Sequence, residues 1–470
     1  MNRKSFLVIM FSLTFANYMG RLDTSIVNVS LPTISNYFKV STSSVSWVVL
    51  IYLLFLTSSL LICGKIADKV GLKKTFMAGY VIFSIGSFLC GVSPTIEFLI
   101  ASRALQGFGG AMFTVAAFAL IPKCLPHDKI GSAFGILAMG SSLGLTTGAP
   151  LGGIISGLFS WQWIFYINIP IGICALFLAA KFIPPDEINK EKGKFNFNYT
   201  GAAFSFLTIL FLLLFLNLGN ELGWLSFYII LFFILFLISL IIFIYSEKKS
   251  SDPLLDFSLL SNKNYAIVIL GTLFGAILLS GNNFLLPFYL QGIKGLSSEL
   301  TGIVYLSYSV TILFASPFAG RVSDKVKPIM LTQLAMLLLI SGILIFAFTL
   351  NTAGLYSTVA FLFINGIGYA FYLPPNNNQL MRLAPEGKQG GASAMVNTTL
   401  NFSFILGVVV FDTVFSNLMG SDSASLKLII QNPVVSLSAF RFSYLSGAIA
   451  CTITLVLLFY VMKRKKRFNQ

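Results

Sequence analysis

The feature that most constrains this chain is a series of long apolar segments. Crossing a hydrocarbon core of roughly 30 Å as a helix takes about 20 residues. We predict fourteen such helices, at 6–30, 45–63, 75–93, 97–121, 131–157, 162–183, 200–218, 224–245, 265–291, 299–319, 329–349, 353–380, 390–417 and 439–462. The segments are too long, and too rich in Leu, Phe and Gly, to be the alternating strands of a transmembrane barrel. We therefore expect an all-α integral membrane protein.

The charged residues follow the pattern of a multi-pass membrane protein. Only 10% of the 470 residues are charged, whereas soluble domains carry about 25%. Of the 31 Lys and Arg residues, 25 fall at the two ends or in alternate connections; the other six are Arg21, Lys39, Arg103, Lys294, Lys427 and Arg441. By the positive-inside rule we expect both termini in the cytoplasm and the protein in the cell membrane. The net charge of +15 therefore does not indicate a nucleic-acid partner.

Two polar interruptions divide the chain. The first is rich in Pro and charge, and the second carries a run of Lys and Ser. They predict six, two and six helices: an N-terminal bundle at 1–183, a cytoplasmic linker at 184–199, two additional helices at 200–245, a second cytoplasmic linker at 246–264, and a C-terminal bundle at 265–470.

A short motif occurs twice at equivalent positions. The stretch 64-GKIADKVGLKK-74 follows the second predicted span, and 320-GRVSDKVKP-328 follows the tenth. Two related halves are typical of transporters that alternate between two states. We interpret the motifs as cytoplasmic latches, in which an acid meets a helix N-terminus or a basic partner; the residues are Gly64, Asp68, Gly71, Lys73, Gly320 and Asp324. The alternative is an ordinary solvated basic loop.

Seven stretches together resemble one known family. They are 22-LDTSIVNVSLP-32, 64-GKIADKVGLKK-74, 103-RALQGFGGA-111, 144-GLTTGAPLGG-153, 161-WQWIFYINIPIG-172, 289-YLQGIKGLSSELTG-302 and 385-PEGKQGGASAMVN-397. In this order the chain resembles the major facilitator superfamily, specifically its fourteen-span drug:proton antiporters. The resemblance implies the major facilitator fold, a central cavity between two six-helix bundles, alternating access, and export driven by proton entry.

The chain departs from the family pattern in two places. In the fifth span the family places proline directly after the glycine at Gly148, whereas here Ala149 intervenes before Pro150. Close helix packing is still expected there, from Gly144, Gly148, Pro150, Gly152 and Gly153. The second departure is Arg21, where the family more often has a small or apolar residue.

The acids Asp23 and Asp412 lie well within predicted spans, and so do Arg21 and Arg103. By the helical rise, Asp23 lies roughly 10 Å and Arg103 about 9 Å below the outer boundary. The first and fourth helices are neighbours in the resembled fold, so we predict an Asp23–Arg103 pair that couples protonation to transport. The alternative is a permanent ion pair that only fixes packing. Asp412 lies at a depth comparable to Arg441, which predicts either a second ion pair or a second proton- or cation-binding carboxylate.

The remaining polar residues inside the spans are candidates for the substrate cavity. Arg21 lies about 200° from Asp23 around the helix, so it needs another partner, a polar cavity or an anionic group of the substrate. A fixed positive charge there would oppose a lipophilic cation. Amides in spans indicate partners or ligands, and we select Asn282, Asn283 and Asn365 as cavity residues with Arg21.

The sequence favours a transporter over an enzyme. The five cysteines and the single histidine show no metal-ligand spacing, and there is no nucleotide-binding loop or catalytic constellation. We expect no cofactor and no metal. The leading hypothesis is proton-coupled export of lipophilic or drug-like compounds by a monomer in contact with membrane lipid. The alternative is a translocator of an anionic lipid, a lipid precursor or a specific metabolite.

Overall fold

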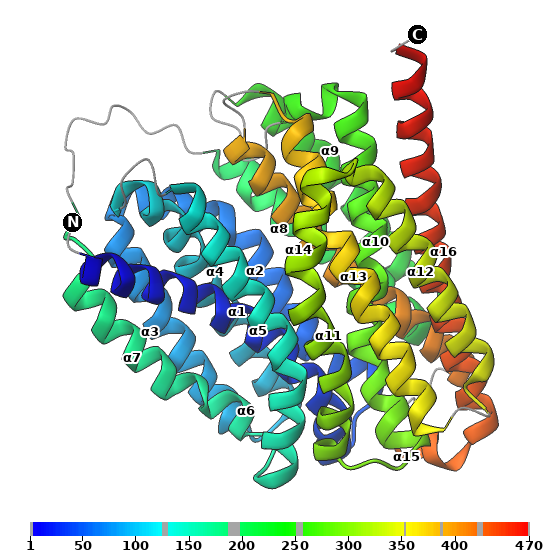
Figure 1. Cartoon of the computed structure of the whole chain (residues 1–470). Coiled ribbons are helices and arrows are strands. Elements are labelled where there is room, and N and C mark those ends of the chain that lie inside the picture. Colours follow the sequence, from blue (N-terminus) through cyan, green and yellow to red (C-terminus); the bar gives the residue numbers. More distant parts are fainter. Residues whose placement is uncertain are drawn as a thin grey trace. The chain divides into compact units, whose positions relative to one another are not determined.

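The computed structural model describes residues 3–124, 130–186, 198–250, 257–351, 354–385, 389–420 and 426–468. Helices make up nearly all of this part of the chain, and it contains no strand (Figure 1). The expected all-α class is therefore confirmed. Within the helices a few side chains lie outside the described residues, among them those of Asp68 and Asp324.

The helices follow the predicted segments closely. The first group is α1 (Arg3–Phe38), α2 (Thr42–Val70), α3 (Leu72–Gly91), α4 (Ile96–Cys124), α5 (Ile130–Leu158), α6 (Trp163–Tyr166) and α7 (Asn168–Phe182). Next come α8 (Tyr199–Leu222) and α9 (Phe227–Lys249). The last group is η2 (Phe257–Ser261), α10 (Lys263–Phe288), η3 (Tyr289–Ile293), α11 (Ser298–Lys325), α12 (Pro328–Thr349), α13 (Leu355–Leu383), α14 (Gln389–Met419), α15 (Leu426–Gln431) and α16 (Pro433–Phe468).

Among the described residues, twelve helical segments are long and apolar enough to cross a membrane. Helices α1 and α5 are not among the twelve, although both occupy predicted spans. Helix α1 carries Arg21 and Asp23, which lower its mean hydropathy. The chain is thus a multi-pass membrane protein, and the count of fourteen spans stays a prediction.

Two local features differ from the predicted spans. The sixth span is interrupted between α6 and α7, and Pro170, which has no N–H, lies in the first turn of α7, where proline is tolerated. The ninth span ends in η3, a single π-helical turn after Pro287. The short helix α15 precedes the last span and was not predicted.

The chain divides into two compact units. Unit 1 comprises Met1–Phe38, Trp47–Phe215 and Leu225–Leu254; unit 2 comprises Lys39–Ser46, Leu216–Trp224 and Leu255–Gln470. Helix α2 begins in unit 2 and continues in unit 1 after Ser46, and the end of α8 belongs to unit 2. The five-part division drawn from the sequence stays a prediction.

The same packing pattern recurs inside both units. In unit 1, α1 packs against α5, and α3 packs against α4 and α7. In unit 2, α10 packs against α14, and α12 packs against α13 and α16. In each set of six spans, the first span therefore packs against the fifth, and the third span packs against the fourth and the sixth. This correspondence is the structural counterpart of the motif that occurs twice in the sequence.

A row of glycines brings α5 into close contact with α1. A Cβ atom at Gly144 would lie 2.3 Å from the Tyr18 carbonyl oxygen, and one at Gly148 would lie 2.5 Å from Ser25 Cβ. At Gly152 the same atom would lie 2.3 Å from the Ile26 carbonyl oxygen. Small residues at four-residue spacing let two backbones approach in this way. Pro150 and Gly153 are buried in the same helix.

We expect Gly148→Ala to destabilise the protein, because its new methyl group overlaps the backbone and side chain of α1. The expected loss is about 1–3 kcal/mol of unfolding free energy, seen as a lower midpoint in thermal unfolding followed by tryptophan fluorescence. Gly320→Ala is the matched control, since a Cβ there meets no described atom within 4 Å. Equal stability of the two variants would contradict the packing argument.

Candidate functional site

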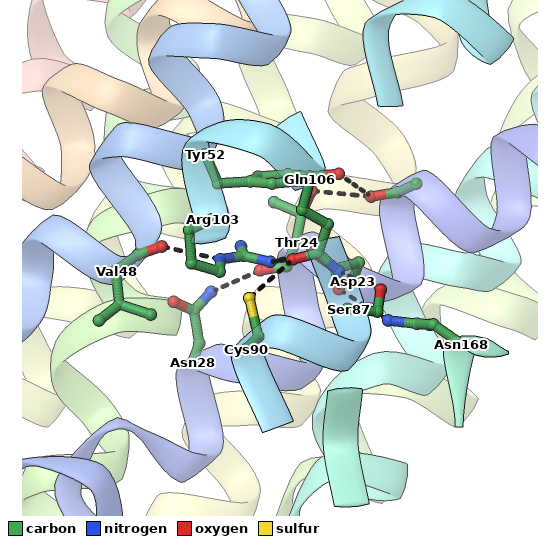
Figure 2. A network of polar contacts seen from close by, with 11 residues as sticks. Asp23, Thr24, Asn28, Val48, Tyr52, Ser87, Cys90, Arg103, Gln106 and Asn168 are labelled. Atoms are coloured by element: carbon green, nitrogen blue, oxygen red, sulfur yellow. Dashed lines mark hydrogen bonds and ion pairs between the residues drawn. The ribbon is translucent and has the colours of Figure 1, made fainter. Parts of the chain in front are cut away.

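An ion pair lies in the interior of unit 1. Arg103 on α4 donates from Nη1 to Asp23 Oδ2 on α1 over 2.5 Å, and both side chains are 0% exposed (Figure 2). The contact predicted from the matched depths of the two residues is therefore confirmed. Its role in proton coupling is not decided by the contact itself.

Two amides complete the environment of the Asp23 carboxylate. Gln106 donates from Nε2 to Oδ1 over 2.9 Å, and Asn168 donates from Nδ2 to the same oxygen over 3.0 Å. The carboxylate thus has three donors, from α4 and from α7. Asn168 lies at the start of α7, directly after the break that follows α6.

Gln106 connects both members of the pair. Its Oε1 accepts from Arg103 over 2.5 Å and from the Cys90 thiol over 3.7 Å, while its Nε2 also donates to Ser87 Oγ over 2.8 Å. The sequence analysis did not select Gln106. Gln106 could have been selected because it lies three residues after Arg103, on the same face of the helix.

Arg103 has further contacts on α2. Its Nε donates to the Val48 carbonyl oxygen over 2.9 Å, and the guanidinium carbon lies 4.0 Å from the centre of the Tyr52 ring. An arginine over an aromatic face gains a cation–π attraction that is larger when desolvated. Tyr52 in turn donates its hydroxyl to the Gly20 carbonyl oxygen over 3.3 Å. Helices α1, α2, α3, α4 and α7 therefore all contribute to one network (Figure 2).

The network is electrically neutral. One carboxylate and one guanidinium balance each other, and amides, a hydroxyl, a thiol and a backbone carbonyl supply further hydrogen bonds. Arg103 Nη2 and Asn168 Oδ1 make no hydrogen bond within the described part of the chain. In a low-dielectric interior, removing one partner of such a pair leaves an uncompensated charge and is strongly destabilising. Any change that protonates Asp23 must therefore also supply Arg103 with a new partner.

Arg21 lies two residues before Asp23 on α1, about 200° around the helix. Its side chain has intermediate exposure and interacts electrostatically with Tyr52. Tyr52 also interacts electrostatically with Asp23 and Arg103. Arg21 and the ion pair thus share one tyrosine, on the helix that follows α1.

The expected ion pair between Asp412 and Arg441 is not formed. Arg441 donates from Nε to the Ala347 carbonyl oxygen over 3.2 Å, and its guanidinium lies 5.9 Å from the centre of the Phe348 ring. Asp412 accepts instead from Ser416 over 3.2 Å and from Asn217 over 3.4 Å. The two charges have similar depth but face different neighbours, so this alternative from the sequence analysis is wrong.

The predicted amides of the cavity all belong to unit 2. Asn282 and Asn365 are buried, with 3% and 1% exposure, and Asn283 has intermediate exposure. Asn365 donates to the Phe361 carbonyl oxygen over 3.4 Å, and its Oδ1 accepts no hydrogen bond within the described part of the chain. The Oδ1 of Asn282 is in the same situation. A role for these amides in substrate binding stays a prediction.

The first motif meets an acid from the linker. Asp186 accepts from the backbone N–H groups of Lys73 and Lys74 over 3.0 and 3.1 Å, at the N-terminus of α3. Gly71 has φ 116°, and a Cβ there would lie 2.2 Å from Asp186 Oδ2. Glycine is therefore needed at this position both for its backbone angle and for its lack of a side chain. Lys73 Nζ reaches the last carbonyls of α7, those of Ala180 and Ile183.

The other motif residues are less constrained. At Gly64 a Cβ would make an ordinary contact of 3.4 Å with Val115, and Gly320 has open space around it. The Asp68 and Asp324 side chains lie outside the described residues. The helix N-terminus in the first motif is thus capped by Asp186, which the sequence analysis placed only in a linker. The latch role of all six residues stays a prediction.

Comparison with known families identifies the chain as a member of one class of membrane transporter. The model of the Major Facilitator Superfamily matches residues 10–200 and 194–408, so the chain belongs to that superfamily. Its members carry small-molecule substrates across membranes, and the chain is accordingly a transporter rather than an enzyme. The fourteen-span antiporter subfamily is not decided by this match.

Similar proteins include transporters with different named substrates. The chain is 31% identical to the riboflavin transporter RibZ of Clostridioides difficile over 457 residues, 95% of each chain. It is 29% identical to the multidrug resistance protein Stp of Mycobacterium tuberculosis over 404 residues, 85% of this chain and 74% of Stp. A bacterial homologue of the human lysosomal transporter Spinster, in an inward-facing and unoccupied conformation, has the same fold, with a TM-score of 0.69, 16% identity and 98% coverage of both chains.

We expect Arg103→Met to lower the unfolding free energy by about 3–5 kcal/mol, because Asp23 would stay buried without its cation. The double variant Asp23→Leu, Arg103→Met should regain most of this loss. Thermal unfolding of the detergent-solubilised protein measures both. Arg382→Met, which removes an exposed arginine, serves as the control and should change stability by less than about 0.5 kcal/mol. A double variant no more stable than Arg103→Met would contradict the ion-pair argument.

Proposed function

We propose that the chain exports lipophilic or drug-like compounds across the cell membrane by proton-coupled alternating access, with both termini in the cytoplasm. The observation that carries the proposal is the buried Asp23–Arg103 pair. Charges inside a membrane are costly and usually mark ion pathways or proton relays. The similarity to the multidrug resistance protein Stp supports the substrate class.

The coupling mechanism follows from the charge balance of the network. A proton that binds Asp23 removes the negative charge that balances Arg103, so the neutral acid and the intact ion pair exclude each other. In the proposed cycle the pair opens in one conformation and Asp23 takes a proton from one side. Arg103, which already contacts the Val48 carbonyl and the Tyr52 ring, then gains the substrate as its new partner. Release of the proton to the other side restores the pair. Gln106 contacts both Arg103 and Asp23, so in this cycle it orients the two side chains whether Asp23 is charged or protonated.

We expect Asp23→Asn to lose efflux driven by a pH gradient, because the amide cannot bind and release a proton. The measurement is dye efflux from proteoliposomes of defined orientation, with the gradient imposed and then collapsed. Glu97→Gln is the matched control, since it removes an exposed acid at the start of α4. Undiminished gradient-driven efflux by Asp23→Asn would exclude Asp23 as the coupling group.

A second candidate is a transporter of one metabolite or of an anionic lipid. It is favoured by the similarity to RibZ, which extends over 95% of both chains. Arg21 supports it as well, because a fixed cation of intermediate exposure, near Tyr52, suits an anionic or strongly polar substrate better than a lipophilic cation. Arg103 suits this role less, since it is fully buried and bonded to Asp23.

Transport of riboflavin and of a lipophilic cationic dye, compared in the same proteoliposomes, distinguishes the two candidates. If drug-like cations are the substrates, we expect saturable dye transport that increases in Arg21→Gln, because the opposing charge is removed. If a metabolite such as a flavin is the substrate, riboflavin flux is saturable and the dye is not carried. Lys427→Gln, an exposed cation on α15, is the control and should change neither flux.

A further inference from the structure

Asp412 lies in a cluster built from three helices of unit 2. The residue is on α14 and is 1% exposed. Ser416, one turn further along α14, donates to its Oδ1, and Asn217 near the end of α8 donates to its Oδ2. The hydroxyls of Thr42, Ser43 and Ser46, in the first turns of α2, also lie within hydrogen-bonding reach of the carboxyl. All of these residues belong to unit 2.

No cation balances this carboxyl within the described part of the chain. The groups that face it from α2 are Thr42, Ser43 and Ser46, and the group from α8 is Asn217. Helix α16 also packs against α14, but its Arg441 is bonded to α12. Asp23 has three donors within 3.0 Å, including an arginine. The groups around Asp412 are all neutral, among them donors at 3.2 and 3.4 Å.

A buried carboxylate with no cation beside it is unfavourable, whereas a neutral carboxylic acid at the same place is not. The orientation of Ser46 agrees with a neutral acid. Its hydroxyl donates its single proton to the Ser43 carbonyl oxygen over 2.7 Å and accepts from Asn217 over 3.2 Å. With its proton donated to Ser43, the Ser46 hydroxyl offers its lone pairs to Asp412 and can accept a hydrogen bond from the neutral acid.

We propose that Asp412 is a proton-binding site in its own right, separate from the Asp23–Arg103 pair, with Ser46 and Asn217 as the positioning residues that set its protonation. Ser46 accepts from the neutral acid, and Asn217 donates to either form. Asn217 comes from α8, so the two additional helices contribute a functional group. The inference extends the proposed function, on which it rests for its place in a transport cycle, but proton binding is measurable without transport.

The cluster also connects protonation to the start of α2. When Asp412 loses its proton, the Ser46 lone pairs face a negative charge, and the contact changes from attractive to repulsive. The first turn of α2 up to Ser46 packs with unit 2, while α2 from Trp47 onward belongs to unit 1. Loss of the proton therefore changes the hydrogen bonds between this first turn and α14.

The test is a pH titration of the purified full-length protein, followed by the infrared C=O stretching band of protonated carboxylic acids. We expect a band that persists at pH values where an ordinary aspartic acid is ionised, that is lost in Asp412→Asn and that remains in Asp23→Asn. Persistence of the band in Asp23→Asn separates this inference from the proposed function, whose failure would appear only in the efflux assay.

Two positioning variants keep the test decisive if Asp412→Asn does not fold. Ser46→Ala removes the acceptor of the acid proton and should lower the titration midpoint by roughly one pH unit. Asn217→Leu removes a donor to the carboxylate and should raise it by a similar amount. Thr413→Val is the matched control, because it removes a hydrogen bond of 3.2 Å between α14 and the Leu216 carbonyl without removing a donor to the carboxyl. Its midpoint should not change.

Three results would overturn the proposal. The first is that the infrared band survives in Asp412→Asn. The second is that Ser46→Ala and Asn217→Leu move the titration midpoint in the same direction. The third is that sodium ions at constant pH abolish the band. The last result would assign the cluster to a metal cation instead of a proton.

Discussion

The arrangement of unit 1 depends on neutralising one negative charge in an apolar interior. Asp23 cannot reach water, so α4 must bring Arg103 to it and α7 must bring Asn168. Arg103 has more donors than one carboxylate can accept, and α2 supplies a carbonyl and an aromatic ring. Five helices are thus held in register by the hydrogen-bonding needs of a single ion pair.

Glycines make this network possible by letting the helices come close enough. A Cβ at Gly86 on α3 would lie 2.8 Å from the Gln106 backbone nitrogen. The close approach brings Ser87 and Cys90 of α3 within reach of the Gln106 side chain. Apolar packing between helices gains little over packing with lipid, so close backbone contact and buried polar bonds carry much of the specificity.

The sequence predicted those features that depend only on how far along its helix a residue lies. Depth along a helix follows from a constant rise, so the Asp23–Arg103 contact was predictable once two neighbouring helices were assumed. The same reasoning failed for Asp412 and Arg441, because equal depth does not determine which neighbour a side chain faces. Gln106 could have been found by its spacing from Arg103. Asn168, Tyr52 and Asn217 could not, since their roles depend on how separate helices pack.

The cap on α3 has a consequence for the order in which the chain can fold. The N-terminus of α3 has no side-chain cap of its own, and the carboxylate that serves it follows Lys73 by 113 residues, beyond α7. During synthesis, α3 through α7 must therefore be made before the α3 N-terminus is satisfied by the chain. The return of Asp186 to this end closes unit 1, so a premature stop before the linker leaves a bundle whose third helix begins with unpaired N–H groups.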